Sequence, residues 1–218
     1  MHKRITAFFA GLVFCLSLIS GCADQTDAPD GDAGQTPPYT IKLNSLVQIF
    51  DSPTYDGCYV DCVGEDGVYT IVEEQTDSED HRWGNLKSGI GWVDLSALAQ
   101  ETPVRGGLAN EVIVQKAQHI IVIDDAPESQ YIVFQATELL SDVCLTSFSL
   151  GANGELAETT LHTAGQLTTE QLLVAQVVFY GDFTLYGLAF TDQKGQPRSF
   201  TLSISGRNGA PILQEISS

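Results

Sequence analysis

Residues 82–95, RWGNLKSGIGWVDL, decide the fold of the first part of the chain. Two short runs, 82–87 and 91–95, combine aromatic and branched apolar residues, as strands prefer. Between them lies Ser88-Gly89, a pair that suits a tight reversal of the chain. The stretch therefore predicts an antiparallel hairpin.

The chain around this hairpin carries further short strand candidates. Residues 40–43, 46–50 and 67–72 are rich in branched apolar and aromatic side chains. A long polar loop separates the second of these runs from the third, and a charged connection leads into the hairpin. Several short strands around one long loop predict a small barrel over residues 39–100.

The order YTIVEE (69–74) followed by RWGNLKSGIGWVDL (82–95) resembles the bacterial SH3-like domain, SH3b. That family typically shows a Trp, a basic strand end, a Gly turn and Gly-Trp followed by a hydrophobic residue. The resemblance covers residues 39–98, and its second half is the specific part. It implies an SH3-like barrel with an aromatic ligand groove beside the long loop.

Side-chain alternation places both tryptophans of the chain away from the barrel core. Neighbouring residues of a strand point to opposite faces. Leu86 is the core residue of its strand, and Trp83 lies three positions away. Val93 and Leu95 share a face, which sends Trp92 to the other one. Both indoles are thus expected either in an open groove, or over the barrel rim and against a second domain.

By the resemblance, further residues of the groove come from the long loop. Phe50 and Tyr55 would flank the indoles of Trp83 and Trp92. The acidic loop residues Asp51 and Asp56 would attract a basic group, such as a lysine or diaminopimelate amine.

Beyond residues 101–107 (ETPVRGG), where Pro and paired Gly interrupt the pattern, the chain is again rich in strand signals. Short β-prone runs with Gly or Asn turns predict an antiparallel β-sandwich over residues 107–218, and hence an all-β protein. It loosely resembles immunoglobulin-like domains in architecture, without their Cys–Trp–Cys framework, and this says nothing of function. The expected strands are 119–124, 131–136, 143–150, 155–163, 172–180, 183–191 and 199–205.

Residues 1–21 read as a secretory signal peptide. A basic start, Lys3-Arg4, precedes an uncharged run over 5–19 that is short for a membrane span. The run ends in Ile19-Ser20-Gly21-Cys22, which resembles the lipobox of bacterial lipoproteins. The resemblance implies a diacylglyceryl group on Cys22, cleavage before it, and an extracytoplasmic protein anchored to the membrane by lipid. The alternative is a plain signal peptide with an incidental cysteine.

Residues 22–38 follow as a tether, because Pro, Gly and Asp abound there and no large apolar residue does. The whole chain has 28 acidic and 10 basic side chains and a net charge of −18. Without Lys3 and Arg4 the ratio is 28 to 8, which gives −20. Such a surface repels phosphate backbones and argues against nucleic acid as a partner.

No sequence motif points to catalysis, a cofactor or a metal. The family of NlpC/P60 cysteine peptidases, which often accompanies SH3b domains, needs an Asp-Cys-Ser-Gly-like motif, and Asp142-Val143-Cys144-Leu145 lacks its Ser-Gly. His119 and His162 have no sequence reason to meet Cys144. Acidic groups such as Glu65-Asp66 could hold calcium, but none of them has the residue spacing of a known calcium-binding loop.

Cys58 and Cys62 could form a disulfide only if the segment turns sharply, because an extended strand would separate their Cα atoms by about 13 Å. Two free thiols are the alternative.

The resulting interpretation is a non-catalytic, monomeric binding module that recognises peptidoglycan peptides or an extended polypeptide. The first alternative is a structural or assembly lipoprotein that docks another envelope protein. The second is a cell-wall hydrolase.

Overall fold

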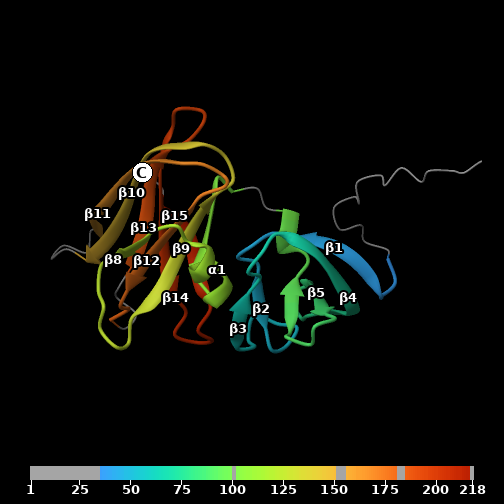
Figure 1. Ribbon diagram of the computed structural model, residues 1–218. Helices are drawn as coiled ribbons and strands as arrows, with labels where there is room; N and C mark the ends of the chain where they lie inside the picture. The colour runs from blue at the N-terminus through green and yellow to red at the C-terminus, as the bar shows by residue number, and fades with distance from the viewer. Residues whose placement is uncertain (1–34, 100–101, 151–155, 181–184, 217–218) are drawn as a thin grey trace, which may run out of the picture.

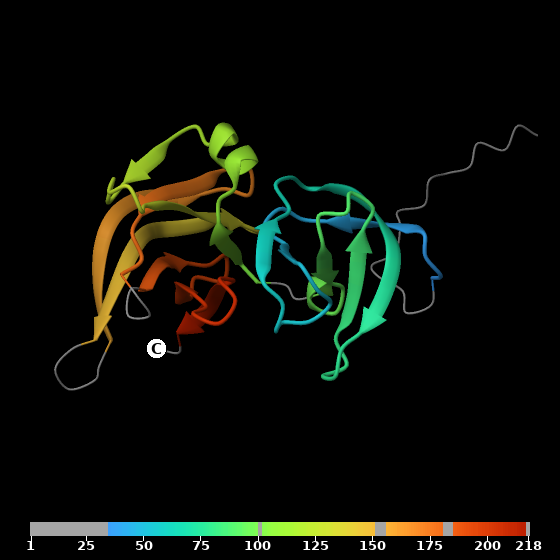
Figure 2. The ribbon, with the colours of Figure 1, turned by 90° about the horizontal axis from the view of Figure 1, so that it is seen from below.

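The computed structural model describes residues 35–99, 102–150, 156–180 and 185–216 (Figure 1). Within these ranges nearly all regular structure is β-strand, with one short α-helix and one 3-10 turn. The predicted all-β class is confirmed. The chain forms two β units, the first over residues 39–99 and the second over residues 104–216, joined by a short connection (Figures 1 and 2).

The first unit is a curled antiparallel sheet around its own core (Figure 2). The strand order is β1-β4-β5-β6-β2-β3, and the 3-10 turn η1 (Ala97–Ala99) follows. Its core collects the inward side chains of these strands, among them Leu43, Ile71 and Val93. The strands are β1 (Tyr39–Leu43), β2 (Gln48–Phe50), β3 (Tyr59–Cys62), β4 (Gly67–Thr76), β5 (Arg82–Leu86) and β6 (Trp92–Asp94).

The predicted hairpin is present, with β5 and β6 paired antiparallel. Its turn depends on two glycines with positive φ, Gly89 at 76° and Gly91 at 150°. A Cβ on Gly91 would lie 2.3 Å from the carbonyl oxygen of Phe50, so this position requires glycine for space as well as for conformation.

The second unit is a sandwich of two sheets, as predicted. One sheet has the order β7-β9-β12-β8 and the other β11-β10-β13-β14-β15, with the main core between them. The strands are β7 (Val104–Leu108), β8 (Ile120–Val122), β9 (Gln130–Ala136), β10 (Leu140–Leu150), β11 (Leu156–Leu167), β12 (Leu172–Val177), β13 (Leu185–Thr191), β14 (Pro197–Ile204) and β15 (Pro211–Ile216).

One pair departs from the purely antiparallel sandwich, since β8 runs parallel to β12. Strands β7 and β8 therefore run in the same direction on opposite sides of the β9–β12 pair. The chain must cross over between them, and the helix α1 (Glu111–Lys116) lies in this crossover. Asn110 caps the helix by accepting a hydrogen bond from the backbone N–H of Ile113.

The second unit begins earlier than predicted. Strand β7 starts at Val104 and pairs with β9, so most of the expected boundary at 101–107 belongs to the sandwich. The paired glycines of this segment lie inside the strand and do not end the domain.

The two units are packed together across a shared apolar cluster. Leu46 and Cys62 of the first unit meet Ile113, Val133 and Val174 of the second. Figure 1 shows α1 beside strands β2 and β3 at this junction. The side-chain amide of Asn110 donates to the carbonyl oxygen of Cys62 at 3.0 Å, which ties the crossover to the first unit.

We predict that Gly187→Ala destabilises the sandwich by about 2–3 kcal/mol through overpacking. A Cβ at this position of β13 would lie 2.2 Å from the carbonyl oxygen of Phe200 and 2.6 Å from the ring of Phe148. Gly107→Ala is the matched control, because its Cβ would meet only Pro211, at 3.7 Å. Urea unfolding measures both, and equal midpoints for the two variants would contradict the packing of β13.

Candidate functional site

The predicted aromatic residues form one cluster, but it is closed. Phe50, Trp83, Trp92 and Ala210 make up this aromatic cluster, with Tyr59 packed against it. The indoles are on the expected face, since neither belongs to the core of the first unit. However, Trp83 is 0% and Trp92 8% exposed, so they offer no open stacking platform in this conformation. The expected open groove is therefore replaced by the alternative arrangement, in which the indoles pack towards the second unit.

Tyr55 lies over the cluster from the long loop. Its ring meets Phe50 edge-on at 5.5 Å and Trp83 at 5.0 Å between centroids. Its hydroxyl donates to the carboxylate of Asp94 at 2.6 Å. Burial, and then this carboxylate, raise the pKa of Tyr55 well above its ordinary value, so the hydroxyl stays protonated.

The two acidic loop residues have different surroundings. Asp51 accepts hydrogen bonds at 2.9 Å from the hydroxyl of Ser52 and from the backbone N–H of Cys58, so it organises its own loop. Asp56 is exposed and forms an ion pair with Arg207 of the second unit. Of the two, Asp56 alone meets the kind of basic group that the sequence suggested, and that group comes from the chain itself.

Asp77 holds the indole N–H of Trp83. Its carboxylate accepts from the indole N–H of Trp83 and from a ring nitrogen of His81, both at 3.0 Å. It also accepts from the backbone N–H groups of Glu79 and His81. Desolvation opposes ionisation, but the hydrogen bonds from Trp83 and from these backbone groups prevail and hold the pKa of Asp77 well below its usual range. The hydrogen bond to Asp77 raises the pKa of His81.

The cysteines outside residues 1–34 are unpaired. Cys58 is exposed, Cys62 is buried and Cys144 is half-buried. Burial is the main cause that raises the pKa of the Cys62 thiol to about 11, so this thiol stays protonated. Cys144 lies 3.8 Å from the hydroxyl of Thr163. Cys22, the signal segment and most of the tether lie outside the described residues.

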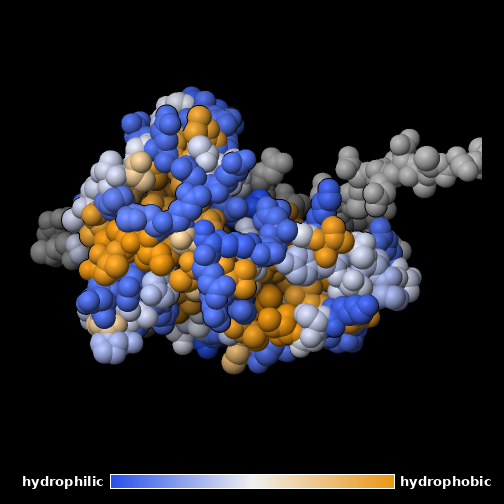
Figure 3. All heavy atoms as spheres, in the orientation of Figure 1, coloured by the Kyte–Doolittle hydropathy of each residue, from blue (hydrophilic) through white to orange (hydrophobic). Residues whose placement is uncertain are grey.

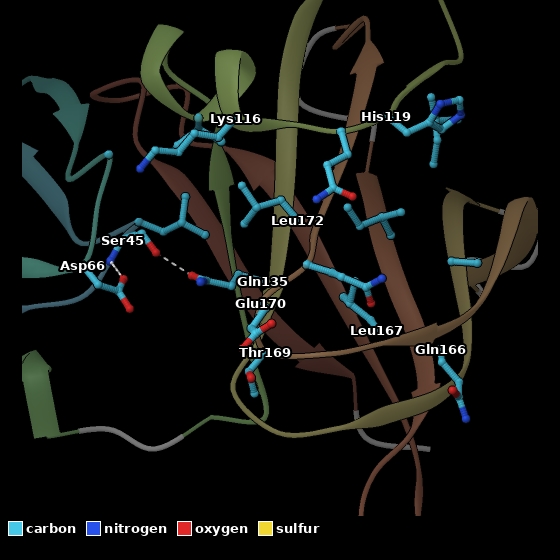
Figure 4. Close-up of a pocket in the computed structure, with 18 of the residues that line it drawn as sticks. Ser45, Asp66, Lys116, His119, Gln135, Gln166, Leu167, Thr169, Glu170 and Leu172 are labelled. Atoms are coloured by element: carbon cyan, nitrogen blue, oxygen red, sulfur yellow. Dashed lines mark hydrogen bonds between the residues drawn. The ribbon is translucent and has the colours of Figure 1, made fainter.

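A separate hollow lies at the junction of the two units, and we call it the junction cleft (Figure 4). It has a volume of about 730 Å³. Its walls come from the first unit at 45–46 and 64–66, from α1 and the segment after it, and from the turn between β11 and β12. His119 and His162, which the sequence did not connect, both line it.

Ser45 links the two units at one end of the cleft (Figure 4). Its hydroxyl donates to the side-chain oxygen of Gln135, and its backbone N–H donates to Asp66 at 2.6 Å. Lys116 of α1 forms an ion pair with Glu65 close by. Glu170 adds another carboxylate on the other wall, so acidic groups outnumber the lysine.

The rest of the lining combines amides, hydroxyls and apolar side chains. The apolar floor comes from the core of the second unit and from the apolar cluster of the junction, and none of the described lining residues is Phe, Tyr or Trp. Such a surface can bind a chain that itself alternates amide groups with apolar side chains. The amides are Gln118, Gln135, Gln166 and Gln171, the hydroxyls Ser45, Thr163 and Thr169, and the floor is Leu46, Ile113, Ile121, Ala164, Leu167, Leu172 and Leu173.

Strand β11 is irregular where it borders the cleft. In its pairing with β10, Leu161 and Ala164 are extra residues without an opposite partner, and both pack against the main core. Bulges of this kind re-aim neighbouring side chains and are frequent next to functional sites. Here they flank His162 and Thr163, which line the cleft.

Two general properties hold for the part of the chain that the structure describes. It contains no group of three or more His, Cys, Asp or Glu side chains placed to hold a metal ion. It also contains no helix long and apolar enough to cross a membrane.

Comparison with protein families, with curated proteins and with solved structures finds no match to this chain.

We predict that Trp83→Ala lowers the free energy of unfolding by about 3–5 kcal/mol, because it removes a fully buried indole. Val68→Ala serves as the control in the same sheet, since Val68 is 67% exposed and its truncation costs about 0.5 kcal/mol or less. Urea denaturation followed by far-UV circular dichroism measures both. A Trp83→Ala protein as stable as the wild type would contradict the burial of this side chain.

We predict that Asp77 makes the stability of the protein depend on pH. Because the pKa of Asp77 is lowered in the folded protein, its charge stabilises the fold above the ordinary carboxyl pKa, and this contribution is lost as the pH falls. Asp77→Asn keeps the shape and removes the charge. The wild type should therefore exceed this variant in urea midpoint near neutral pH, and the difference should shrink in acid. A difference that is constant from pH 7 to pH 3 would refute this role.

Proposed function

We propose that the chain is a non-catalytic lipoprotein of the bacterial cell envelope that binds peptides in the junction cleft. The lipobox-like end of the leader supports a lipid on Cys22, and the acidic composition supports a partner other than nucleic acid. A tether of 16 residues, 23–38, would give the body a root-mean-square reach of roughly 20–24 Å from the membrane surface. We do not propose that an open aromatic groove binds the ligand, because both indoles are buried.

The single observation that carries the proposal is the lining of the cleft. Side-chain amides and hydroxyls can pair with the N–H and C=O groups of a peptide, and the apolar floor can accept its side chains. Asp66 and Glu170 favour a ligand with an amine, such as the lysine or diaminopimelate of a peptidoglycan stem. A peptide therefore fits better than a carbohydrate that stacks on aromatic rings.

The surroundings of two thiols, those of Cys144 and Cys62, support the non-catalytic assignment. The thiol of Cys144 lies 3.8 Å from the hydroxyl of Thr163, on a strand paired on both sides with β11 and β13. Cys62 lies in the apolar cluster of the junction with a raised pKa, which disfavours the reactive thiolate.

Isothermal titration of protein lacking residues 1–22 with purified muropeptides tests the proposal. We expect binding of a disaccharide-tetrapeptide that has a free diaminopimelate amine, and weaker binding once that amine is acetylated. Glu170→Gln should weaken binding of the free-amine form about five-fold, from the loss of about 1 kcal/mol of exposed charge attraction.

Glu128→Gln is the matched control, because it removes the same charge from an exposed site outside the cleft lining. Equal losses in the two variants would show that only net charge matters. No heat with any muropeptide would reject peptidoglycan stems as the ligand, and release of new fragments from peptidoglycan would reject the non-catalytic assignment.

A structural or assembly role is the second candidate, favoured by exposed apolar side chains. Figure 3 shows hydrophobic residues that reach the surface on both units. On β4, Val68 and Val72 are exposed at 67% and 41% and lie on the same face of the strand. Pull-down from detergent-solubilised membranes separates the two roles. A protein partner that is lost with Val68→Lys/Val72→Lys, together with no muropeptide binding, would favour assembly.

A further inference from the structure

The turn between β14 and β15, residues 205–210, sits on the aromatic cluster of the first unit. We propose that this face of the first unit is a binding site for a polypeptide turn that presents Arg-Asn, and that the chain's own 205–210 turn fills it as an internal ligand. A partner protein with such a turn would bind when the internal one lifts away.

Hydrogen bonds to the backbone define the site. The backbone N–H of Tyr59 donates to the carbonyl oxygen of Asn208 at 3.0 Å. The side-chain amide of Asn208 donates in return to the carbonyl oxygen of Tyr55 at 2.9 Å. These two bonds connect Tyr55 of the long loop and Tyr59 of β3 to a single residue of the turn. The bond to Tyr55 requires the side-chain amide of asparagine, whereas the bond from Tyr59 is made to the backbone.

Charge and shape provide the other contacts. Asp56 pairs with Arg207, and both side chains are largely exposed, at 65% and 70%. Ala210 enters the aromatic cluster and is 6% exposed, beside Phe50 and Trp92. The binding site thus offers an exposed carboxylate to a cation and a small apolar space to a methyl group.

The turn keeps its shape by bonds within its own hairpin. Ser205 and Ala210 are joined by a backbone hydrogen bond of 2.8 Å, and the N–H of Gly209 donates to the carbonyl oxygen of Ser205 at 2.9 Å. The side chain of Asn208 accepts from the N–H of Ala210, and Gly209 has a φ of 75°. The turn is therefore preorganised. Its binding site on the first unit is preorganised too, because the hydrogen bonds of Asp51 hold the long loop in place.

The contact can open without separation of the two units. The apolar cluster around Ile113 and the hydrogen bond between Ser45 and Gln135 hold the units together at other points. The polar contacts of the turn are the two hydrogen bonds of Asn208 and the exposed Asp56–Arg207 pair, which contributes about 1 kcal/mol or less. Next to the turn, the side-chain amide of Gln48 also donates to the carbonyl oxygen of Pro211 at 2.6 Å. None of the residues of this site lines the junction cleft, and the inference is independent of the peptide binding proposed above.

The test uses the full-length chain in mild detergent and a labelled cyclic peptide of residues 203–212, SISGRNGAPI. Arg207→Ala/Asn208→Ala removes the contacts of the internal turn. Fluorescence anisotropy should show that this variant binds the peptide at least ten-fold more tightly than the wild type, whose site is occupied. A peptide with the Arg and Asn replaced by Ala should bind at least ten-fold more weakly than the cyclic peptide itself.

Two further variants define the site. Arg198→Ala removes an ion pair with Glu215 inside the second unit, so it should behave as the wild type does. Asp56→Asn in the released background should weaken peptide binding. Circular dichroism and the urea midpoint verify that each variant is folded.

A folded, released variant that binds the cyclic peptide no better than the wild type would overturn the proposal, and so would equal binding of the peptide without Arg and Asn. If the released variant does not fold, the proposal is tested by adding peptide at high concentration to the wild type. Millimolar peptide should then shift the amide resonance of Tyr59, and an unmoved resonance would overturn the proposal.

Discussion

The burial of two indoles outside the core of the first unit is the constraint on which the rest of the structure depends. Trp83 and Trp92 belong to the aromatic cluster and not to that core. Each indole removes roughly 150–250 Å² from water when it is buried, which is too much apolar surface to leave open in a stable fold. The long loop and the second unit close over them, and the indole N–H of Trp83 is satisfied by Asp77.

The same packing creates the junction cleft. Because the second unit is held against the first at the aromatic cluster and at the Ile113 cluster, segments from both units form the two walls of one hollow. Its polar groups converge from parts of the chain that are about 90 residues apart, as the Ser45–Gln135 hydrogen bond illustrates. The turn at 205–210 and the cleft are thus two separate consequences of one interface.

Alternation and turn chemistry predicted much of the fold. They located the hairpin at 82–95 and the opposite faces of Val93 and Trp92. Three of the missed elements each break a local rule. β7 contains paired glycines, β15 begins with proline, and α1 has the β-branched run Val112-Ile113-Val114, where the Asn110 cap and the crossover decide in favour of helix.

The candidate sites were less predictable. Parity decides which face of a strand a tryptophan occupies, but it does not show what lies opposite, so the closure of the aromatic cluster could not be read from the sequence. The cleft gathers residues from five separate segments that carry no shared motif.

The most direct test is a nuclear Overhauser measurement between the methyl group of Ala210 and the ring protons of the aromatic cluster in the full-length wild type. Strong cross-peaks to Phe50 or Trp92 are predicted, and their absence in a folded protein would contradict the docking of the second unit over the indoles.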